Sequence, residues 1–358
     1  MSKFHKLKIV DIVRETADSV SLAFHIPENL KNDFKYIQGQ YISLKLNVNN
    51  EEIRRAYSIC STPLTDENLR VAVKKVNGGK GSVYLNEKIK VGDELEVMTP
   101  MGNFYSELNP TKKNNFVLFA GGSGITPMLS IIKTSLIAEP QSSIILFYAN
   151  RNEESIIFKN QLNKISEEYS ARFKIYHILD QSSNTDELFV GIMTTEKAKI
   201  LHEKFINSDS ENEYFICGPS AMMSNVEKTL NDYKIEKSKI HIEYFTTSTT
   251  QNQPSTINRQ PSLFVCCDAT IICDGDEKIV HIEPDTTILQ AALDANFDAP
   301  YACRGGSCCT CRAKLMEGKV SMDLNYALLD SEVAEGYILT CQSHPLTPTV
   351  VVDYDNGR

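Results

Sequence analysis

The chain has no long hydrophobic run, and this absence excludes a helix that spans a membrane. No stretch of its 358 residues approaches the roughly 18 apolar residues needed to cross a bilayer. The N-terminus also lacks the apolar stretch of a signal peptide, because polar and charged residues lead into the alternating Leu7, Ile9 and Ile12. We therefore expect a cytoplasmic protein that does not bind membranes.

The chain also lacks a net positive charge, which argues against nucleic acid as a partner. The formal net charge is −9, and residues 263–358 contain 6 basic and 15 acidic side chains, whereas residues 1–262 contain 31 of each. An acidic surface disfavours nucleic acid and suits electrostatic steering toward a basic face of a partner protein. The same charge can serve solubility alone, so both interpretations stay open.

No internal repeat is present, and the length predicts two or three domains. Up to residue 108, short strand-like runs separated by turn signals predict an antiparallel β-barrel; the runs are 19–26, 41–46, 69–76 and 94–98. From Asn114 onward the order changes to strand, glycine loop, helix and strand, over residues 116–120, 125–138 and 144–149. This order predicts a doubly wound α/β domain over residues 109–246.

The polar run at residues 246–262 has almost no apolar side chains, so it cannot bury a core. We expect a flexible linker at 247–261, followed by a compact α+β domain at 262–358. Within that domain the pattern predicts strands at 263–267 and 278–282 and a short helix near 288–295.

Ten cysteines in a reducing compartment indicate metal or redox chemistry rather than disulfides, and eight of them lie after residue 265. Cys303, Cys308 and Cys311 follow the C-x4-C-x2-C pattern, and Cys341 comes after 29 intervening residues. This is the spacing of a plant-type 2Fe-2S cluster. A structural zinc site is the alternative, but zinc usually takes two C-x2-C pairs and the chain has one.

The remaining cysteines of this region are not expected to bind the cluster. Cys309 lies between two expected ligands, and we expect its side chain to point away from the cluster. On the early strands a free cysteine behaves as a small apolar residue, so we expect Cys266, Cys267 and Cys273 to pack in the core.

Residues 55–58 read R-A-Y-S at the end of a predicted barrel strand, and here the chain resembles the ferredoxin–NADP reductase superfamily. Arg55 offers a forked contact to a phosphate, the Tyr57 ring offers a face for the isoalloxazine, and Ser58 offers a hydrogen bond to the flavin N5 edge. Gly81 and Ser82 resemble the second phosphate contact of that superfamily. The resemblance implies FAD, with FMN left open.

A glycine loop follows the predicted strand at 116–120. Its backbone N–H groups can bind a pyrophosphate at the start of a helix, and the candidate residues are Gly121, Gly122, Ser123, Gly124 and Thr126.

A second loop begins with Cys217, Gly218 and Pro219 at the end of a later strand of the same sheet, where ligands bind. The resemblance implies that Cys217 lies near the nicotinamide; the alternative is a buried strand cysteine before a turn.

Arg151 follows the second strand, where an NAD enzyme would have an acidic residue. An arginine there suits the 2′-phosphate of NADPH, although Glu153 and Glu154 are close and NADH stays possible. The resemblance also implies that Glu243 and Phe245 lie against the flavin, and Phe245 can equally be ordinary core.

The three motif groups cover nearly the whole chain. Together with residues 54–60, 215–223 and 300–303 they resemble the reductase subunits of phenylacetyl-CoA epoxidase and related oxygenases. This resemblance implies a β-grasp ferredoxin domain and electron transfer from NADPH through FAD and a 2Fe-2S cluster to a diiron oxygenase component. It implies catalytic roles for Tyr57, Ser58 and Cys217.

Two alternatives remain. One is a general NAD(P)H:acceptor reductase that serves a desaturase or hydroxylase, and the other is a non-catalytic zinc protein. In the reductase hypothesis, the linker lets the ferredoxin domain move between flavin and acceptor.

Overall fold

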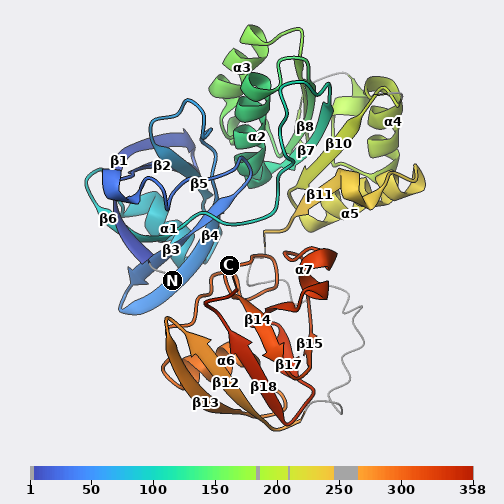
Figure 1. Cartoon of the computed structure of the whole chain (residues 1–358). Helices are drawn as coiled ribbons and strands as arrows, with labels where there is room; N and C mark the ends of the chain where they lie inside the picture. Colours follow the sequence, from blue (N-terminus) through green and yellow to red (C-terminus); the bar gives the residue numbers. More distant parts are fainter. Residues whose placement is uncertain (1–3, 183–185, 209, 246–264, 358) are drawn as a thin grey trace.

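The computed structural model describes residues 4–182, 186–208, 210–245 and 265–357. It contains a barrel, a parallel sheet flanked by helices, and a C-terminal domain that lies beneath the barrel in Figure 1. The expected linker at 247–261 lies outside the described residues. No helix in the described part of the chain is long and apolar enough to cross a membrane.

The first sheet is antiparallel and has the order β4-β3-β6-β1-β2-β5. A bridge between Ile59 and Val71 joins its two edges just beyond β4, and alternating apolar side chains such as Leu7 and Ile9 fill the interior. The strands are β1 (Phe4–Thr16), β2 (Ser19–His25), β3 (Tyr41–Val48), β4 (Glu51–Ser58), β5 (Leu69–Lys74) and β6 (Glu94–Met98), and the helix α1 (Lys80–Glu87) follows β5.

The second sheet is parallel with the order β11-β10-β7-β8-β9. Alternate residues of β7 face opposite sides, so Leu118 packs with α2 and α3 whereas Val117 packs with α4 and α5. The strands are β7 (Asn115–Gly121), β8 (Ser143–Asn150), β9 (Phe173–Leu179), β10 (Asn212–Cys217) and β11 (Ile240–Glu243). The helices are α2 (Ile125–Ala138), α3 (Lys159–Glu168), α4 (Thr195–Phe205) and α5 (Ser220–Asp232).

The C-terminal domain has a mixed sheet with the order β13-β12-β18-β14-β16 and a separate pair, β15-β17. Its strands are β12 (Cys267–Cys273), β13 (Asp276–Ile282), β14 (Arg312–Glu317), β15 (Val320–Met322), β16 (Tyr337–Leu339), β17 (Ser343–Pro345) and β18 (Thr349–Asp353). Its helices are α6 (Ile288–Asp294) and α7 (Asp330–Ala334). Short 3-10 helices lie at Glu28–Leu30, Gly122–Gly124, Glu153–Ser155, Glu187–Phe189 and Lys237–Lys239.

The predicted fold class is confirmed: a β-barrel, a doubly wound sheet and an α+β ferredoxin domain occur in that order. Part of the strand expected at 263–267 lies outside the described residues, and residues 265 and 266 belong to no strand. In the described part of the chain the first strand of this domain begins at Cys267 and runs to Cys273, because its hydrogen-bonded partners on β13 and β18 extend over those residues.

Candidate functional site

A cavity of about 620 Å³ lies where the barrel, the parallel sheet and the ferredoxin domain meet. The ferredoxin domain contributes Tyr301 and Arg304 to its wall. Eight of the candidate residues predicted from the sequence also line it: Arg55, Tyr57, Ser58, Gly81, Ser82, Ser123, Thr126 and Phe245. The structure therefore brings the predicted flavin residues together with part of the predicted nucleotide loop.

The end of β4 supplies the core of this site. Arg55 is exposed, Tyr57 is half-buried and Ser58 is 3% exposed. The alternation of the strand directs Tyr57 toward the barrel core and Ser58 to the opposite face, where it meets Glu243. The Ser58 hydroxyl donates a hydrogen bond to Glu243 Oε2 at 2.9 Å, across 185 residues of chain. Ser58 and Glu243, which were predicted from two separate motifs, are therefore hydrogen-bonded to each other.

Glu243 is a candidate proton carrier of the site. Burial raises the pKa of its carboxyl group to about 8, and the hydrogen bond from Ser58 acts in the opposite direction. Glu243 ends β11 and lies in register with Cys217 at the end of β10. Cys217 is fully buried, and burial raises the pKa of its thiol well above the ordinary value.

Gly81 and Ser82 lie in the first turn of α1, a helix that the sequence patterns did not predict. The positive end of a helix favours a phosphate, so this position suits the predicted contact. The Ser82 hydroxyl accepts a hydrogen bond from Val76 N at 3.0 Å and thereby orders the preceding turn.

The glycine loop packs against the loop that follows β10. A Cβ on Gly124 would lie 2.1 Å from the carbonyl oxygen of Cys217, so only glycine permits this approach. Gly121 in turn contacts Pro219 and Gly218. The glycine pattern therefore reflects contact between the two loops as well as access for a ligand.

Two side chains hold the glycine loop in position. Thr126 Oγ1 donates to the Ser123 carbonyl at 3.0 Å, and the buried Tyr148 hydroxyl donates to the Gly122 carbonyl at 3.0 Å. Thr126 was predicted from the sequence but Tyr148 was missed, because nothing in its strand pattern distinguishes it from core.

Arg151 is exposed one residue beyond β8 and does not line the 620 Å³ cavity. Glu153 forms an ion pair with Lys159 at 3.4 Å, and among the described residues no ion pair of Arg151 is present. Ser155 bonds with Asn152 in a capping box of a 3-10 helix, so its hydroxyl already has local partners.

The four predicted cluster ligands come together in two pairs. Cys303 N donates to Cys308 Sγ at 3.5 Å, and Gly305 N donates to Cys303 Sγ at 3.3 Å. The neighbouring Cys308 thiol lowers the pKa of Cys303 to about 5, and Cys311 likewise lowers the pKa of Cys341. Convergent thiols with N–H groups directed at them are the ligand set of an iron–sulfur cluster.

The cysteines outside these pairs divide by exposure. Cys309 donates from its thiol to the Ala327 carbonyl at 3.3 Å, which directs it away from the pairs. Cys267 and Cys273 are 1% and 5% exposed and pack in the core, as expected. Cys266 was also expected to pack in the core, and this is wrong. Its side chain is exposed because it points to the opposite face of the sheet from Cys267 and Cys273.

The cluster loop docks on β3 of the barrel through residues that the sequence patterns did not reveal. Cys309 N donates to the Tyr41 hydroxyl at 2.7 Å, and Thr310 Oγ1 lies 3.1 Å from Ser43 Oγ and 3.3 Å from the Tyr41 hydroxyl. Tyr41 and Cys308 are also part of one apolar contact group. The cluster site is therefore held directly against the flavin domain.

Arg54, next to the predicted Arg55, anchors the same interface. It is 4% exposed, forms an ion pair with Asp298, and donates to the Ala299 carbonyl at 3.4 Å. Its guanidinium lies 4.5 Å from the centroid of the Tyr301 ring. The adjacent pair Arg54 and Arg55 was the only sequence feature that pointed to this role, and the sequence does not tell which of the two contacts the ferredoxin domain.

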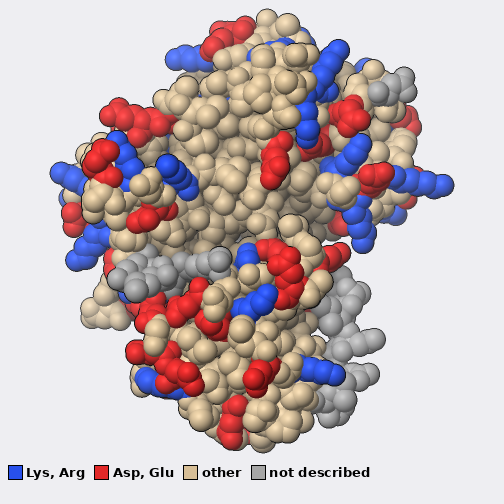
Figure 2. Space-filling model, in the orientation of Figure 1, with Lys and Arg blue, Asp and Glu red and all other residues tan. Residues whose placement is uncertain are grey.

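The surface of the ferredoxin domain is predominantly acidic, as the residue counts predict. On the face drawn in Figure 2, red carboxylates gather on the lower domain with few blue groups between them. Residues 263–358 contain 15 acidic and 6 basic side chains. This charge suits a partner with a basic face.

Comparisons with known proteins agree with these three parts. The chain matches the Oxidoreductase FAD-binding domain over residues 6–105, the Oxidoreductase NAD-binding domain over 118–228 and the 2Fe-2S iron-sulfur cluster binding domain over 271–346.

Relatives match over nearly the full length. The chain is 40% identical to a subunit of 1,2-phenylacetyl-CoA epoxidase of Escherichia coli (strain K12), over 99% of each chain. It is 31% identical to the ferredoxin reductase component of 3-ketosteroid-9-alpha-monooxygenase of Rhodococcus rhodochrous, over 97% of this chain and 96% of that one. Among solved structures, phthalate dioxygenase reductase, described as a modular structure for electron transfer from pyridine nucleotides to 2Fe-2S, matches with a TM-score of 0.60 and 25% identity over 98% of both chains.

Proposed function

Because the chain belongs to the family that includes this phenylacetyl-CoA epoxidase subunit and related oxygenase reductases, we propose that its electron acceptor is a diiron phenylacetyl-CoA epoxidase. The chain is an oxidoreductase that transfers electrons from NAD(P)H through FAD to a 2Fe-2S cluster and on to an oxygenase. The observation that supports this particular acceptor is the 40% identity over 99% of both chains.

The proposed flavin residues fit FAD. Arg55 and the first turn of α1, with Gly81 and Ser82, surround a cavity large enough for a cofactor and offer cationic and N–H contacts to its phosphates. Tyr57 offers the ring face and Ser58 the hydrogen bond to the reactive edge. When bound, the flavin would accept a hydride, which carries two electrons, from the nicotinamide and release the electrons one at a time. This conversion is required because the 2Fe-2S cluster accepts only one electron at a time.

We propose that Ser58 and Glu243 hold the proton that accompanies this chemistry. A carboxyl group with a pKa of about 8 is mostly protonated at neutral pH. The Ser58 hydroxyl, which donates to Glu243 Oε2 at 2.9 Å in the structure, would pass this proton on by turning its own hydrogen toward the flavin and accepting from the carboxyl group. Phe245 lines the cavity and would cover the flavin face until the nicotinamide replaces it. Cys217, in register with Glu243, would then border the nicotinamide.

For the nucleotide we propose NADPH. The loop with Gly121, Gly122, Ser123, Gly124 and Thr126, together with Gly218 and Pro219, would hold the pyrophosphate and orient the nicotinamide. Arg151 is exposed just beyond the carboxyl end of β8, without an ion-pair partner among the described residues, which leaves its charge available for a 2′-phosphate.

The cluster ligands fit a 2Fe-2S group, and we propose that Cys303 and Cys308 bind one iron while Cys311 and Cys341 bind the other. The pairing follows from the contacts between the thiols within each pair. We further propose the division 1–108, 109–246 and 262–358, with 247–261 as linker. In the docked arrangement, Tyr301 and Arg304 of the cluster loop border the flavin cavity, which suits direct electron entry.

The test compares acceptors. The reductase with its flavin and cluster is mixed with NADPH and either phenylacetyl-CoA epoxidase or a 3-ketosteroid monooxygenase oxygenase component, and oxygenated product is measured per NADPH. We expect coupled turnover with the epoxidase at least 10-fold faster than with the other component. Equal turnover with both, or none with the epoxidase, would contradict the proposed acceptor and favour a general acceptor reductase.

A further inference from the structure

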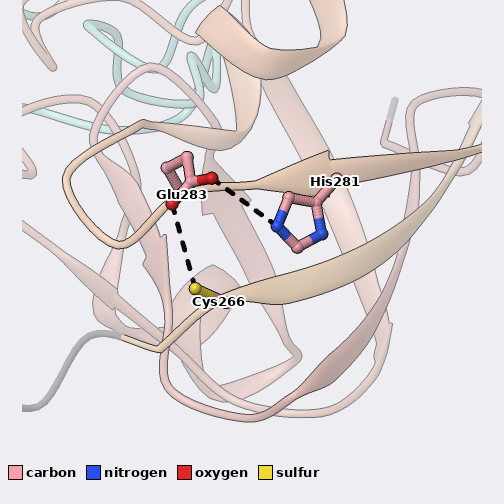
Figure 3. Close-up of side chains that lie close together, drawn as sticks. All are labelled: Cys266, His281 and Glu283. Atoms are coloured by element: carbon pink, nitrogen blue, oxygen red, sulfur yellow. Dashed lines mark hydrogen bonds and ion pairs between the residues drawn. The ribbon is translucent and has the colours of Figure 1, made fainter.

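A group of side chains with metal-binding chemistry lies on the outer face of β12 and β13 (Figure 3). Cys266 directly precedes β12, His281 lies near the end of β13 and Glu283 directly follows β13; all three are exposed. None of them lines the cavities of the functional site. The proposed electron transfer therefore does not account for this group.

The register of the two strands brings these residues together. Asp268 pairs with His281, and Cys267 pairs with Ile282, so Cys266 lies opposite Glu283. Side chains alternate between the two faces of a strand, which places both pairs on the same outer face. A sulfur, an imidazole and two carboxylates thus meet at adjacent positions without any rearrangement of the backbone.

The separations are those of a nearly formed tetrahedral site. The ligand atoms of Cys266, His281 and Glu283 all lie within 4.8 Å of one another. Cys266 Sγ is 3.9 Å from Glu283 Oε2, and His281 Nε2 is 3.7 Å from Glu283 Oε1. With zinc bond lengths of about 2.0–2.3 Å, tetrahedral ligand atoms lie roughly 3.4–3.6 Å apart. Small side-chain rotations would close the site.

A second feature of a metal site is present in Asp268. Its Oδ1 lies 2.8 Å from His281 Nδ1, so Nδ1 carries a proton and the neutral ring presents the lone pair of Nε2 toward Cys266 and Glu283. Metal-bound histidines usually donate their other N–H to a carboxylate in this manner, which fixes the tautomer and the ring orientation. Ion pairs of His281 with Asp268 and Glu283 would need no thiol beside them, so the position of Cys266 adds to the argument for a metal site.

We propose that Cys266, His281 and Glu283 bind a zinc ion, with water as the fourth ligand and Asp268 orienting the histidine. Sulfur, nitrogen and carboxylate oxygen together are a ligand set that zinc accepts. Binding releases the thiol proton of Cys266 to solvent, together with the Nε2 proton of any His281 ring that is in its charged form. The ion links the residue that precedes β12 to the end of β13, and it shields the exposed thiol from alkylation and oxidation.

The test uses the full chain with its flavin and cluster in place. Cys266 is alkylated with iodoacetamide at increasing zinc concentration, and its modification rate is read from the corresponding peptide by mass spectrometry, with the other cysteine peptides as internal controls. We expect saturating zinc to slow modification of Cys266 at least 10-fold. If zinc leaves this rate unchanged, the proposal is overturned.

Variants distinguish this site from zinc bound elsewhere. His281→Gln should raise the zinc concentration for half-protection at least 10-fold, and Asp268→Asn should raise it about 10-fold or more because it removes the orienting partner. His25→Gln changes an exposed histidine at the end of β2 and should leave protection unchanged. Equal protection in the wild type and His281→Gln would refute the site, whatever the affinity of zinc for the whole protein.

Discussion

Replacing Arg54 with methionine is predicted to loosen the ferredoxin domain from the barrel. The Arg54 side chain is 4% exposed and makes three contacts across the interface, to Asp298, Ala299 and Tyr301. Methionine keeps much of the apolar stem and removes the charge. The change therefore tests the polar anchor rather than the packing around it.

The expected magnitude follows from the three contacts. Asp298 is 68% exposed, so its ion pair contributes only about 0.5–1 kcal/mol after screening by solvent. The contact with Tyr301 adds about 1–1.5 kcal/mol because it is partly desolvated, and the long bond to Ala299 adds about 0.5 kcal/mol. The sum of about 2–3 kcal/mol corresponds to a roughly 30- to 150-fold shift of the docking equilibrium.

Lys45 provides the matched control. It pairs with Arg54 across β3 and β4 and shares two of its neighbours, Glu52 at 3.4 Å and the Phe4 ring at 5.4 Å. Its ion pairs and ring contact within the described residues stay inside the barrel. Lys45→Met thus removes a charge from the same surface without removing an anchor.

Two measurements follow docking. After rapid mixing with NADPH, loss of the visible cluster absorbance reports flavin-to-cluster electron transfer. Small-angle scattering gives the radius of gyration, which increases when the ferredoxin domain separates from the rest of the chain. Arg54→Met should slow electron transfer from the flavin to the cluster and increase the radius of gyration, whereas Lys45→Met should resemble the wild type. An unchanged transfer rate and scattering curve for Arg54→Met, or equal effects of both variants, would refute the role of Arg54.

Three further changes test the site. Glu243→Gln should slow NADPH-driven cytochrome c reduction about 10²-fold; the wild-type rate should fall as pH rises through about 8, where the carboxyl loses its proton, and a pH profile of the variant that also falls there would contradict this role. Cys308→Ser should abolish the inorganic sulfide content while extracted flavin stays near one per chain, and retained sulfide would count against Cys308 as a cluster ligand. Arg151→Gln should raise KM for NADPH about 10- to 100-fold and leave KM for NADH within about twofold, because one charge-assisted contact is lost; equal changes for both nucleotides would exclude a role for the 2′-phosphate.

Local patterns predicted the elements of this fold well. The strand–helix–strand unit around residues 116–149 could be predicted because its pattern involves only residues close in sequence, and the structure has this unit as β7, α2 and β8. The spacing of Cys303 and Cys308 is also local, and their thiols lie together in the structure. The alternation of β12 also contained an overlooked signal: Cys267 and Cys273 share one parity and are buried, whereas Cys266 has the other and is exposed. Counting parity would have separated the core cysteines from the surface one.

Contacts between distant segments were beyond the sequence patterns. Tyr41 and Cys309 are 268 residues apart, and Ser58 and Glu243 are 185 apart, so no local period relates them. Gly124 illustrates a further difficulty. Its motif indicated a phosphate site, but the structure adds a second requirement, contact with the Cys217 carbonyl, that depends on where another loop lies.

The docked arrangement places two demands on the same surface. The cluster loop must lie against the flavin cavity to receive electrons, yet this contact leaves Cys308 only 3% exposed and covers Cys309 with Tyr41. An oxygenase must therefore receive electrons through another face of the loop or after the domain is released. The polar anchor at Arg54 and Asp298, in which the Asp298 side chain is 68% exposed, resembles interdomain interfaces that open and close. If release is required, Arg54→Met slows electron entry into the cluster but speeds delivery to the oxygenase; if delivery uses the exposed side, only entry changes.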